Sequence, residues 1–278
     1  MKIWLGDSTG GGLVHPEDAT VSVVDHGFTV GDGVFETMKT VDGQAFALTR
    51  HLDRLTRSAR GLGLPDPDHD LVRDACEQVL AANPTDGGAR VRVTYTGGMA
   101  PLGSDRGGAP ATLVVAVGPS RPPADRAAIA TVPWTRNENA PTAGLKTTSY
   151  ADNVVMLAHA TRRGASEAVF ANTAGNLCEG TGSNVFVGIG GKLLTPPLAA
   201  GCLGGITRAL VLEWTDAEEA DLPFAVLADA DEVFITSSLR DIQPVDRVDD
   251  RELPGTPGPL TRSAMAAFAA RAADDIDP

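Results

Sequence analysis

Cysteine, lysine and aromatic residues are all scarce in this chain of 278 residues, and the shortages exclude several classes of protein. The three cysteines, Cys76, Cys178 and Cys202, are an odd number without CxxC spacing, so neither a disulfide framework nor a metal site is indicated. Acidic residues outnumber basic ones by 36 to 23, giving a formal net charge of -13, and no run of lysine or arginine occurs. Nucleic acid is therefore not expected as a partner.

Long apolar runs are also absent. No segment approaches the roughly 20 apolar residues that a membrane-spanning helix needs. The N-terminus reads MKIWLGD and then becomes polar and glycine-rich, so it lacks the apolar core of a signal peptide. We therefore expect a cytoplasmic protein without a membrane partner. With 42% hydrophobic and 21% charged residues, the chain has enough apolar material for one large domain or two modest ones.

Strand-like and helix-like segments alternate through both halves of the chain, which predicts an α/β protein. The expected strands are residues 19–25, 33–40, 90–96, 111–117, 127–132, 167–171, 184–187 and 232–236. The expected helices are residues 50–62, 68–82, 150–163, 206–214 and 260–272. A Gly/Pro-rich segment at residues 96–110 is long enough to be an active-site lid.

A proline-rich stretch at residues 119–123 is the best candidate for a linker. It predicts a smaller N-terminal domain of residues 1–118, a linker of residues 119–126 and a larger C-terminal domain of residues 127–278.

Lysine is unusually rare here: of the 23 basic residues only four are lysines, namely Lys2, Lys39, Lys146 and Lys192. Lys146 is the only lysine between Lys39 and Lys192, and it lies in a loop that opens a helix. An amine can form an imine with an aldehyde cofactor, which a guanidinium cannot do. By residue type alone, a solvated loop lysine is the commoner explanation.

Three further clusters combine small residues with polar groups. Glu179 lies in a Gly/Thr/Ser-rich turn, where a carboxylate could approach a flat heteroaromatic ring. Residues 204–208 (GGITR) open a helix with two glycines, and such an N-terminus attracts anions. Residues 236–238 (TSS) would add hydroxyl and N–H donors. Each cluster alone is equally compatible with an ordinary solvated turn.

In their order along the chain, these segments resemble the fold-type-IV pyridoxal phosphate enzymes, a family of branched-chain aminotransferases, D-amino acid aminotransferases and aminodeoxychorismate lyases. Residues 25–37 (DHGFTVGDGVFET) resemble the family's N-terminal signature, and residues 50–55 (RHLDRL) its HxxRL helix. The later motifs follow in the family's order: Lys146, Glu179, residues 205–208 and residues 231–238. The resemblance covers nearly the whole chain and implies a two-domain α/β fold, a pyridoxal 5'-phosphate (PLP) cofactor and a homodimer.

The resemblance also implies roles for individual residues. Lys146 would hold the cofactor covalently and act as the base that removes the substrate's α-proton. Glu179 would accept a hydrogen bond from the pyridine nitrogen. Tyr150, four residues after Lys146, would contact the cofactor's phenolic oxygen.

The phosphate of the cofactor would be held by a separate set of donors. The resemblance assigns Arg54 as the side chain that clamps it. The amides of Ile206 and Thr207, at a helix N-terminus, and the residues Ser237 and Ser238 would assist. Local donors of this kind could bind a dianion despite the negative net charge.

The sequence favours the lyase reaction of the family, in which 4-amino-4-deoxychorismate gives 4-aminobenzoate, a folate precursor, and pyruvate. Thr37 is the residue that points to this reaction. By resemblance, aminodeoxychorismate lyases often carry threonine at the end of the signature, where branched-chain aminotransferases typically carry glycine. A hydroxyl there would help proton transfer, although a threonine is also common in strands. The alternatives are an aminotransferase acting on D-amino acids or branched-chain amino acids and, less favoured, a non-catalytic PLP-binding protein.

The substrate itself is expected to be a small amino-bearing carboxylate. The residue that binds its carboxylate is left open. Met99 occupies a place where an arginine is expected by resemblance, and both Arg92 and Arg106 are near it in sequence.

Overall fold

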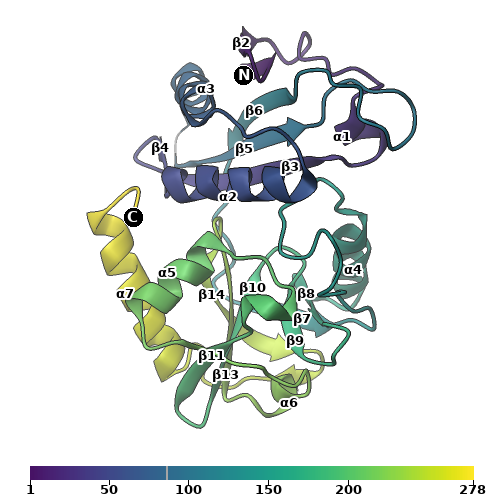
Figure 1. The fold of residues 1–278 in the computed structure, drawn as a ribbon. Helices are drawn as coiled ribbons and strands as arrows, with labels where there is room; N and C mark the ends of the chain where they lie inside the picture. The colour runs from purple at the N-terminus through teal and green to yellow at the C-terminus, as the bar shows by residue number, and fades with distance from the viewer. Residues whose placement is uncertain (86) are drawn as a thin grey trace. The chain divides into compact units, whose positions relative to one another are not determined.

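The computed structural model describes residues 1–85 and 87–278, which divide into two compact units (Figure 1). Unit 1 comprises Met1–Arg121, Leu145–Tyr150 and Ile276–Pro278, and unit 2 comprises Pro122–Gly144 and Ala151–Asp275. This division differs from the predicted domains in two places. The segment that carries Lys146 and the C-terminal tail both pack with the N-terminal unit, although they are distant from it in sequence.

Unit 1 is built on a six-stranded sheet in the order β2-β1-β6-β5-β3-β4, with antiparallel pairing throughout. Its strands are β1 (Ile3–Asp7), β2 (Gly10–Val14), β3 (Gly33–Val41), β4 (Gln44–Ala45), β5 (Ala89–Thr96) and β6 (Thr112–Pro119). A turn at Asp42 and Gly43 joins β3 to β4, and both residues have the positive φ that a tight two-residue hairpin needs.

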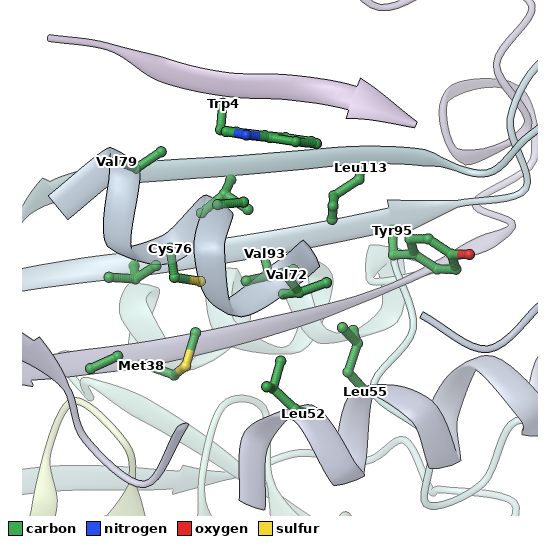
Figure 2. Close-up of a cluster of buried hydrophobic side chains, with 14 of the residues drawn as sticks. Trp4, Met38, Leu52, Leu55, Val72, Cys76, Val79, Val93, Tyr95 and Leu113 are labelled. Atoms are coloured by element: carbon green, nitrogen blue, oxygen red, sulfur yellow. The ribbon is translucent and has the colours of Figure 1, made fainter. Parts of the chain in front are cut away.

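Three helices complete unit 1: α1 (His26–Thr29), α2 (Leu48–Leu62) and α3 (His69–Ala82). The three- and four-residue spacing of apolar residues on α2 and α3 turns one face of each helix toward the sheet. Figure 2 shows the core that results, with side chains from both helices and from β1, β3, β5 and β6. It includes Trp4, Met38, Leu52, Leu55, Val72, Cys76, Val79, Val93, Tyr95 and Leu113.

The segment Leu145–Tyr150 joins unit 1 by pairing with the edge of β3. The Phe35 N–H donates to the Lys146 carbonyl at 3.0 Å, and the Thr148 N–H donates to the Gly33 carbonyl at 2.8 Å. An isolated bridge links the residues between them. The backbone of Lys146 is therefore held as part of a sheet rather than as a free loop.

Unit 2 is built on a nine-stranded mixed sheet in the order β12-β11-β10-β13-β14-β7-β8-β9, with β15 pairing to β14. The strands are β7 (Ala127–Thr131), β8 (Glu167–Ala171), β9 (Leu177–Gly180), β10 (Asn184–Ile189), β11 (Lys192–Thr195), β12 (Glu218–Glu219), β13 (Glu232–Ser237), β14 (Asp241–Val248) and β15 (Arg251–Glu252). The helices are α4 (Ala151–Arg162), the 3-10 turn η1 (Leu198–Ala200), α5 (Ile206–Trp214), α6 (Val226–Asp229) and α7 (Pro259–Asp274).

The α/β class is confirmed, but the predicted strand at residues 19–25 is wrong. Val21 and Val23 are exposed, so their alternation with polar residues does not mark a face buried in a sheet. The segment ends in a turn, in which the Asp25 N–H donates to the Ser22 carbonyl at 3.0 Å. Across the residues that the structure describes, no helix has the length and apolar character needed to cross a membrane.

Candidate functional site

In unit 1, the ring of Phe35 is contacted by the side chains of Lys146, Arg92 and Tyr150. The Nζ of Lys146 lies 4.4 Å from the ring centroid, and the guanidinium carbon of Arg92 lies 3.6 Å from it. The ring of Tyr150 packs edge-on at a centroid distance of 5.4 Å and an interplanar angle of 78°. Two cations close to one aromatic ring are attracted by its electrons, which helps to hold both.

Arg92 is positioned by the pairing of β3 with β5, in which it lies opposite Thr37. Opposite residues of an antiparallel pair project on the same face, so the Thr37 side chain is a neighbour of this guanidinium. The Nε of Arg92 donates to Thr94 Oγ1 at 3.3 Å, and burial lowers the pKa of this guanidinium. Among residues 1–85 and 87–278, no carboxylate forms an ion pair with it. The guanidinium can therefore receive an anionic ligand.

Arg106, the other arginine that the sequence left open, is already committed to the protein. It forms two hydrogen bonds to the Asp32 carboxylate, at 2.7 and 2.6 Å. It also donates to the carbonyls of Gly63 and Leu62, at the end of α2, at 2.8 and 2.7 Å. These bonds anchor the 97–110 loop, and they make Arg106 a structural residue.

Arg54 lies in a buried cluster with Glu36 and His51. The Glu36 carboxylate accepts hydrogen bonds from Arg54 Nε at 2.8 Å and from Nη2 at 2.7 Å, and its Oε2 is 2.6 Å from His51 Nδ1. Residues 51 and 54 are one turn apart on α2, while Glu36 comes from β3 on the face of the sheet that α2 covers. The orientation of the Arg54 guanidinium is thus fixed by a carboxylate that sequence reasoning did not single out.

The charges in this cluster settle its protonation states. Burial alone would raise the pKa of Glu36, but the Arg54 guanidinium and His51 outweigh it and hold that pKa well below the ordinary 4.5. For His51, burial and the nearby positive charges of Arg54 and Lys146 hold the pKa below its ordinary 6.5, against the attraction of Glu36. At neutral pH the cluster therefore contains one carboxylate, one guanidinium and a neutral imidazole.

We expect these shifts to make the protein lose stability on acidification. The unfolded chain takes up a proton at His51 as the pH falls through 6.5, before the folded protein does, so the free energy of unfolding should fall there. The slope from this residue is at most about 1.4 kcal/mol per pH unit. Below pH 4.5 the same reasoning applies to Glu36, whose pKa is also lower in the folded state.

Denaturant unfolding at a series of pH values measures this effect. The His51→Asn variant keeps a side-chain N–H and should flatten the decline that begins at pH 6.5. Replacing the exposed His15 with asparagine is the matched control and should leave the profile unchanged. An unaltered slope in His51→Asn would show that another group is responsible.

In unit 2, Glu179 lies near the end of β9, and its carboxylate is held from two sides. One oxygen accepts the Leu203 N–H at 2.9 Å, and the other lies 3.7 Å from Arg136 Nη2. Arg136 is itself placed by Asn153, at 3.3 Å, and by the ring of Phe170, at 4.9 Å. Because Arg136 lies in a loop far from Glu179 in sequence, no pattern in the chain identified it as a partner.

Asn184 ties the turn before α5 to the same region. Its amide donates to the Leu203 carbonyl at 2.8 Å. Gly205 caps α5, and a Cβ there would lie 2.0 Å from the Asn184 side-chain oxygen, so a larger residue would displace Asn184. The first amides of the helix, those of Ile206 and Thr207, have no acceptor within a helix and lie at its positive end.

Asn184 also lies opposite Thr236, because β10 pairs with β13. The Thr236 hydroxyl is buried and has no hydrogen-bond partner in the part of the chain that the structure describes. Ser237 and Ser238 follow directly after it, at the end of β13. Unit 2 thus brings together a carboxylate, a helix N-terminus and several hydroxyl groups.

The predicted site residues therefore fall into two groups. Unit 1 holds Thr37, Arg54, Lys146 and Tyr150, and unit 2 holds Glu179, Ile206, Thr207, Ser237 and Ser238. Arg208, which belongs to the same sequence motif as Ile206, uses its side chain structurally, donating to the Pro196 carbonyl and to Glu219. The chain supplies an amine, N–H donors suited to an anion and a carboxylate acceptor.

Comparison with known proteins identifies the family to which this chain belongs. Residues 33–248 match the family described as Amino-transferase class IV. A Methanocaldococcus jannaschii protein named "Putative branched-chain-amino-acid aminotransferase" is 34% identical over 90% of this chain and 89% of its own. A Mycobacterium tuberculosis "Bifunctional aminodeoxychorismate lyase / D-amino acid transaminase" is 34% identical over 82% of this chain and 85% of its own.

A solved structure, that of a fold IV transaminase from Curtobacterium pusillum, shares the fold with a TM-score of 0.87. It has 30% sequence identity, and the match covers 98% of each chain. The family model alone spans more than half of the chain. The protein is therefore an enzyme of the class IV aminotransferase family, whose members use PLP as their cofactor.

Proposed function

We propose that PLP is held by the two groups of residues described above. Its three distinctive features are an aldehyde, a phosphate dianion and a pyridine nitrogen. Lys146 offers an amine for the first, and Glu179 offers an acceptor for the third. Arg54, with the first amides of α5, offers N–H donors for the phosphate. The partnerless buried hydroxyl of Thr236 supports this fit, because buried polar atoms are normally satisfied by a protein group or a ligand.

When bound, PLP supplies an aldehyde that condenses with amino groups and a pyridine ring that draws electrons away from the bond being broken. The protein supplies the rest. Lys146 binds the cofactor through Nζ and then removes and returns the α-proton. Glu179 keeps a proton on the pyridine nitrogen, and Tyr150 donates to the phenolic oxygen. Ser237 and Ser238 complete the phosphate contacts.

The reaction that these residues support best is amino transfer between an amino acid and a 2-oxo acid. The observation that carries the choice of an amino-bearing carboxylate as substrate is the position of Arg92, whose guanidinium contacts the same Phe35 ring as the Lys146 amine. The choice of amino transfer over the lyase reaction rests on the relatives. A guanidinium that contacts the same ring as the reacting amine suits a substrate that carries both an amino group and a carboxylate. The transaminase names of the relatives point the same way, toward D-amino or branched-chain amino acids.

The aminodeoxychorismate lyase reaction, which the sequence favoured, is the second candidate. One relative carries both activities in its name. Thr37, opposite Arg92 on the same face of the sheet, would supply the hydroxyl that helps proton transfer in this reaction. Both reactions need the Lys146 amine, so the amino-group acceptor is what distinguishes them.

One assay therefore separates the two functions. We expect D-alanine, D-glutamate or L-leucine to donate an amino group to pyruvate or 2-oxoglutarate, with no product when the 2-oxo acid is omitted. In a parallel reaction, 4-amino-4-deoxychorismate without an acceptor tests for release of 4-aminobenzoate. Formation of 4-aminobenzoate without any amino transfer would reverse our preference, and a Thr37→Gly variant would then test the role of the hydroxyl.

We also propose that the enzyme is a homodimer. Large apolar side chains are exposed on two segments of unit 1 that adjoin each other, since the Ala100 N–H donates to the Val24 carbonyl at 3.2 Å. A second copy of the chain is the partner that would cover them. The exposed apolar residues of these two segments are Val21, Val23, Phe28, Val30, Met99 and Leu102.

A further inference from the structure

Helix α2 carries His51 and Arg54, yet its own sequence provides no cap for its N-terminus. The residue before the helix is Ala47, which has the left-handed conformation (φ 54°, ψ 39°) and no side chain that could accept a hydrogen bond. Alanine is among the poorest residues at this position, where serine, threonine, aspartate and asparagine are favoured. The first turn of α2 would fray if nothing else satisfied its amides.

The missing cap comes from the C-terminal tail, 228 residues away along the chain. Asp277 accepts the Thr49 N–H at 2.8 Å through one carboxylate oxygen and the Thr49 hydroxyl at 2.6 Å through the other. The Ile276 carbonyl accepts the Ala47 N–H at 2.8 Å, and the Pro278 carbonyl accepts from Arg50 Nε. The tail thus gives the first turn both an acceptor and a negative charge at its positive end.

His51, which follows Arg50 on α2, belongs to the buried cluster with Glu36 and Arg54. The His51 N–H makes a bond of 3.1 Å to the Ala47 carbonyl, at the start of the helix, while its ring contacts Glu36. Glu36 in turn holds the Arg54 guanidinium through two hydrogen bonds. The first turn of α2 therefore connects the tail to the arginine assigned to the phosphate: the Asp277 carboxylate holds Thr49, and the Ile276 carbonyl holds Ala47, which bonds His51.

We propose that Asp277 is a positioning residue for cofactor binding, which acts through the first turn of α2 to fix Arg54. This inference rests on the proposed role of Arg54 in holding the phosphate of PLP. It predicts that removing one half-buried acidic residue from the tail weakens the affinity for a phosphate that the tail does not touch.

The test compares Asp277→Ala with Asp277→Asn and Asp274→Ala in the full-length protein. Asparagine is as good a hydrogen-bonding cap as aspartate and lacks only the charge, so Asp277→Asn should keep most of the wild-type affinity. Asp274→Ala removes a carboxylate of the same tail region that is exposed at the end of α7, and serves as the matched control. Titrating the apo-protein with PLP, we expect Asp277→Ala to bind about five-fold more weakly, the effect of losing one N-cap.

Two further readouts separate positioning from a general loss of structure. Pyridoxal, which lacks the phosphate, should bind equally to Asp277→Ala and to the wild type. In an Arg54→Ala background, Asp277→Ala should cause no additional loss of PLP affinity, because the two residues act through the same contact. An equal loss for PLP and pyridoxal, or an undiminished loss in the Arg54→Ala background, would overturn the inference.

Amide hydrogen exchange of residues 48–51 in the apo-protein reports the cap without any cofactor. We expect faster exchange in Asp277→Ala than in the two other variants. Faster exchange with unchanged PLP affinity would also overturn the inference, because the cap would then have no influence on Arg54. A wild-type protein that binds no PLP would instead refute the proposed function, so the two failures are distinguishable.

Discussion

Replacing Lys146 with alanine should lower the rate of amino transfer by about 10³-fold or more, because the variant loses both its covalent link to PLP and its base. The geometry supports this size of effect. The Lys146 amine lies 4.4 Å from the centroid of the Phe35 ring, which the Arg92 guanidinium also contacts. Steady-state kinetics with an amino acid and a 2-oxo acid measure the loss.

Chemical labelling checks the same assignment independently of turnover. Borohydride treatment of the protein loaded with PLP should fix the cofactor on the peptide that contains Lys146. Lys192→Ala is the matched control, since that lysine is exposed in the β10–β11 hairpin and should be dispensable. A label on the peptide of Lys39 or Lys192 would contradict the role given to Lys146.

The second large effect is expected for Arg92→Leu. Loss of a charge-assisted contact with the substrate carboxylate should raise KM for an amino acid donor by about 10- to 100-fold. A primary amine donor without a carboxylate should not be penalised in the same way, so the ratio of the two kcat/KM values is the informative quantity. Arg92→Lys should restore activity only partly, because an ammonium lacks the planar fork of donors.

The matched control for this variant lies on the same strand. Arg90 precedes Arg92 by two residues and is exposed, and Arg90→Leu should leave both donors unaffected. If Arg92→Leu lowered the two kcat/KM values by the same factor, the guanidinium would be a general structural element instead of a carboxylate site.

The sequence predicted most of the fold because its periodic segments are long and their ends are marked. Helix α5 begins at Ile206 and ends at Trp214 as expected, and α2 ends at the left-handed Gly63. The segment at residues 19–25 shows where this reasoning fails. Alternating valines predict a strand only if one face is buried, and burial depends on a partner strand that the local sequence does not reveal.

The candidate site was predicted less completely, because several of its residues act through contacts across the sequence. Glu36 lies inside the signature quoted for the resemblance, but only the pairing of β3 with α2 shows that it binds Arg54. The spacing of His51 and Arg54 does place both on one helix face, a signal available from the sequence. Nothing local marked Arg136 or the capping role of Asp277.

The hydrogen bonds that attach Lys146 to the edge of β3 have a consequence for how the enzyme can move. Shifting the main chain at this residue would break its sheet bond to Phe35, so displacement of the amine is confined to rotations about the bonds of the lysine stem. The stem behaves as a short tether anchored at a rigid point. An amine released during turnover therefore stays at a high effective concentration near its target, and its return needs no rearrangement of the backbone.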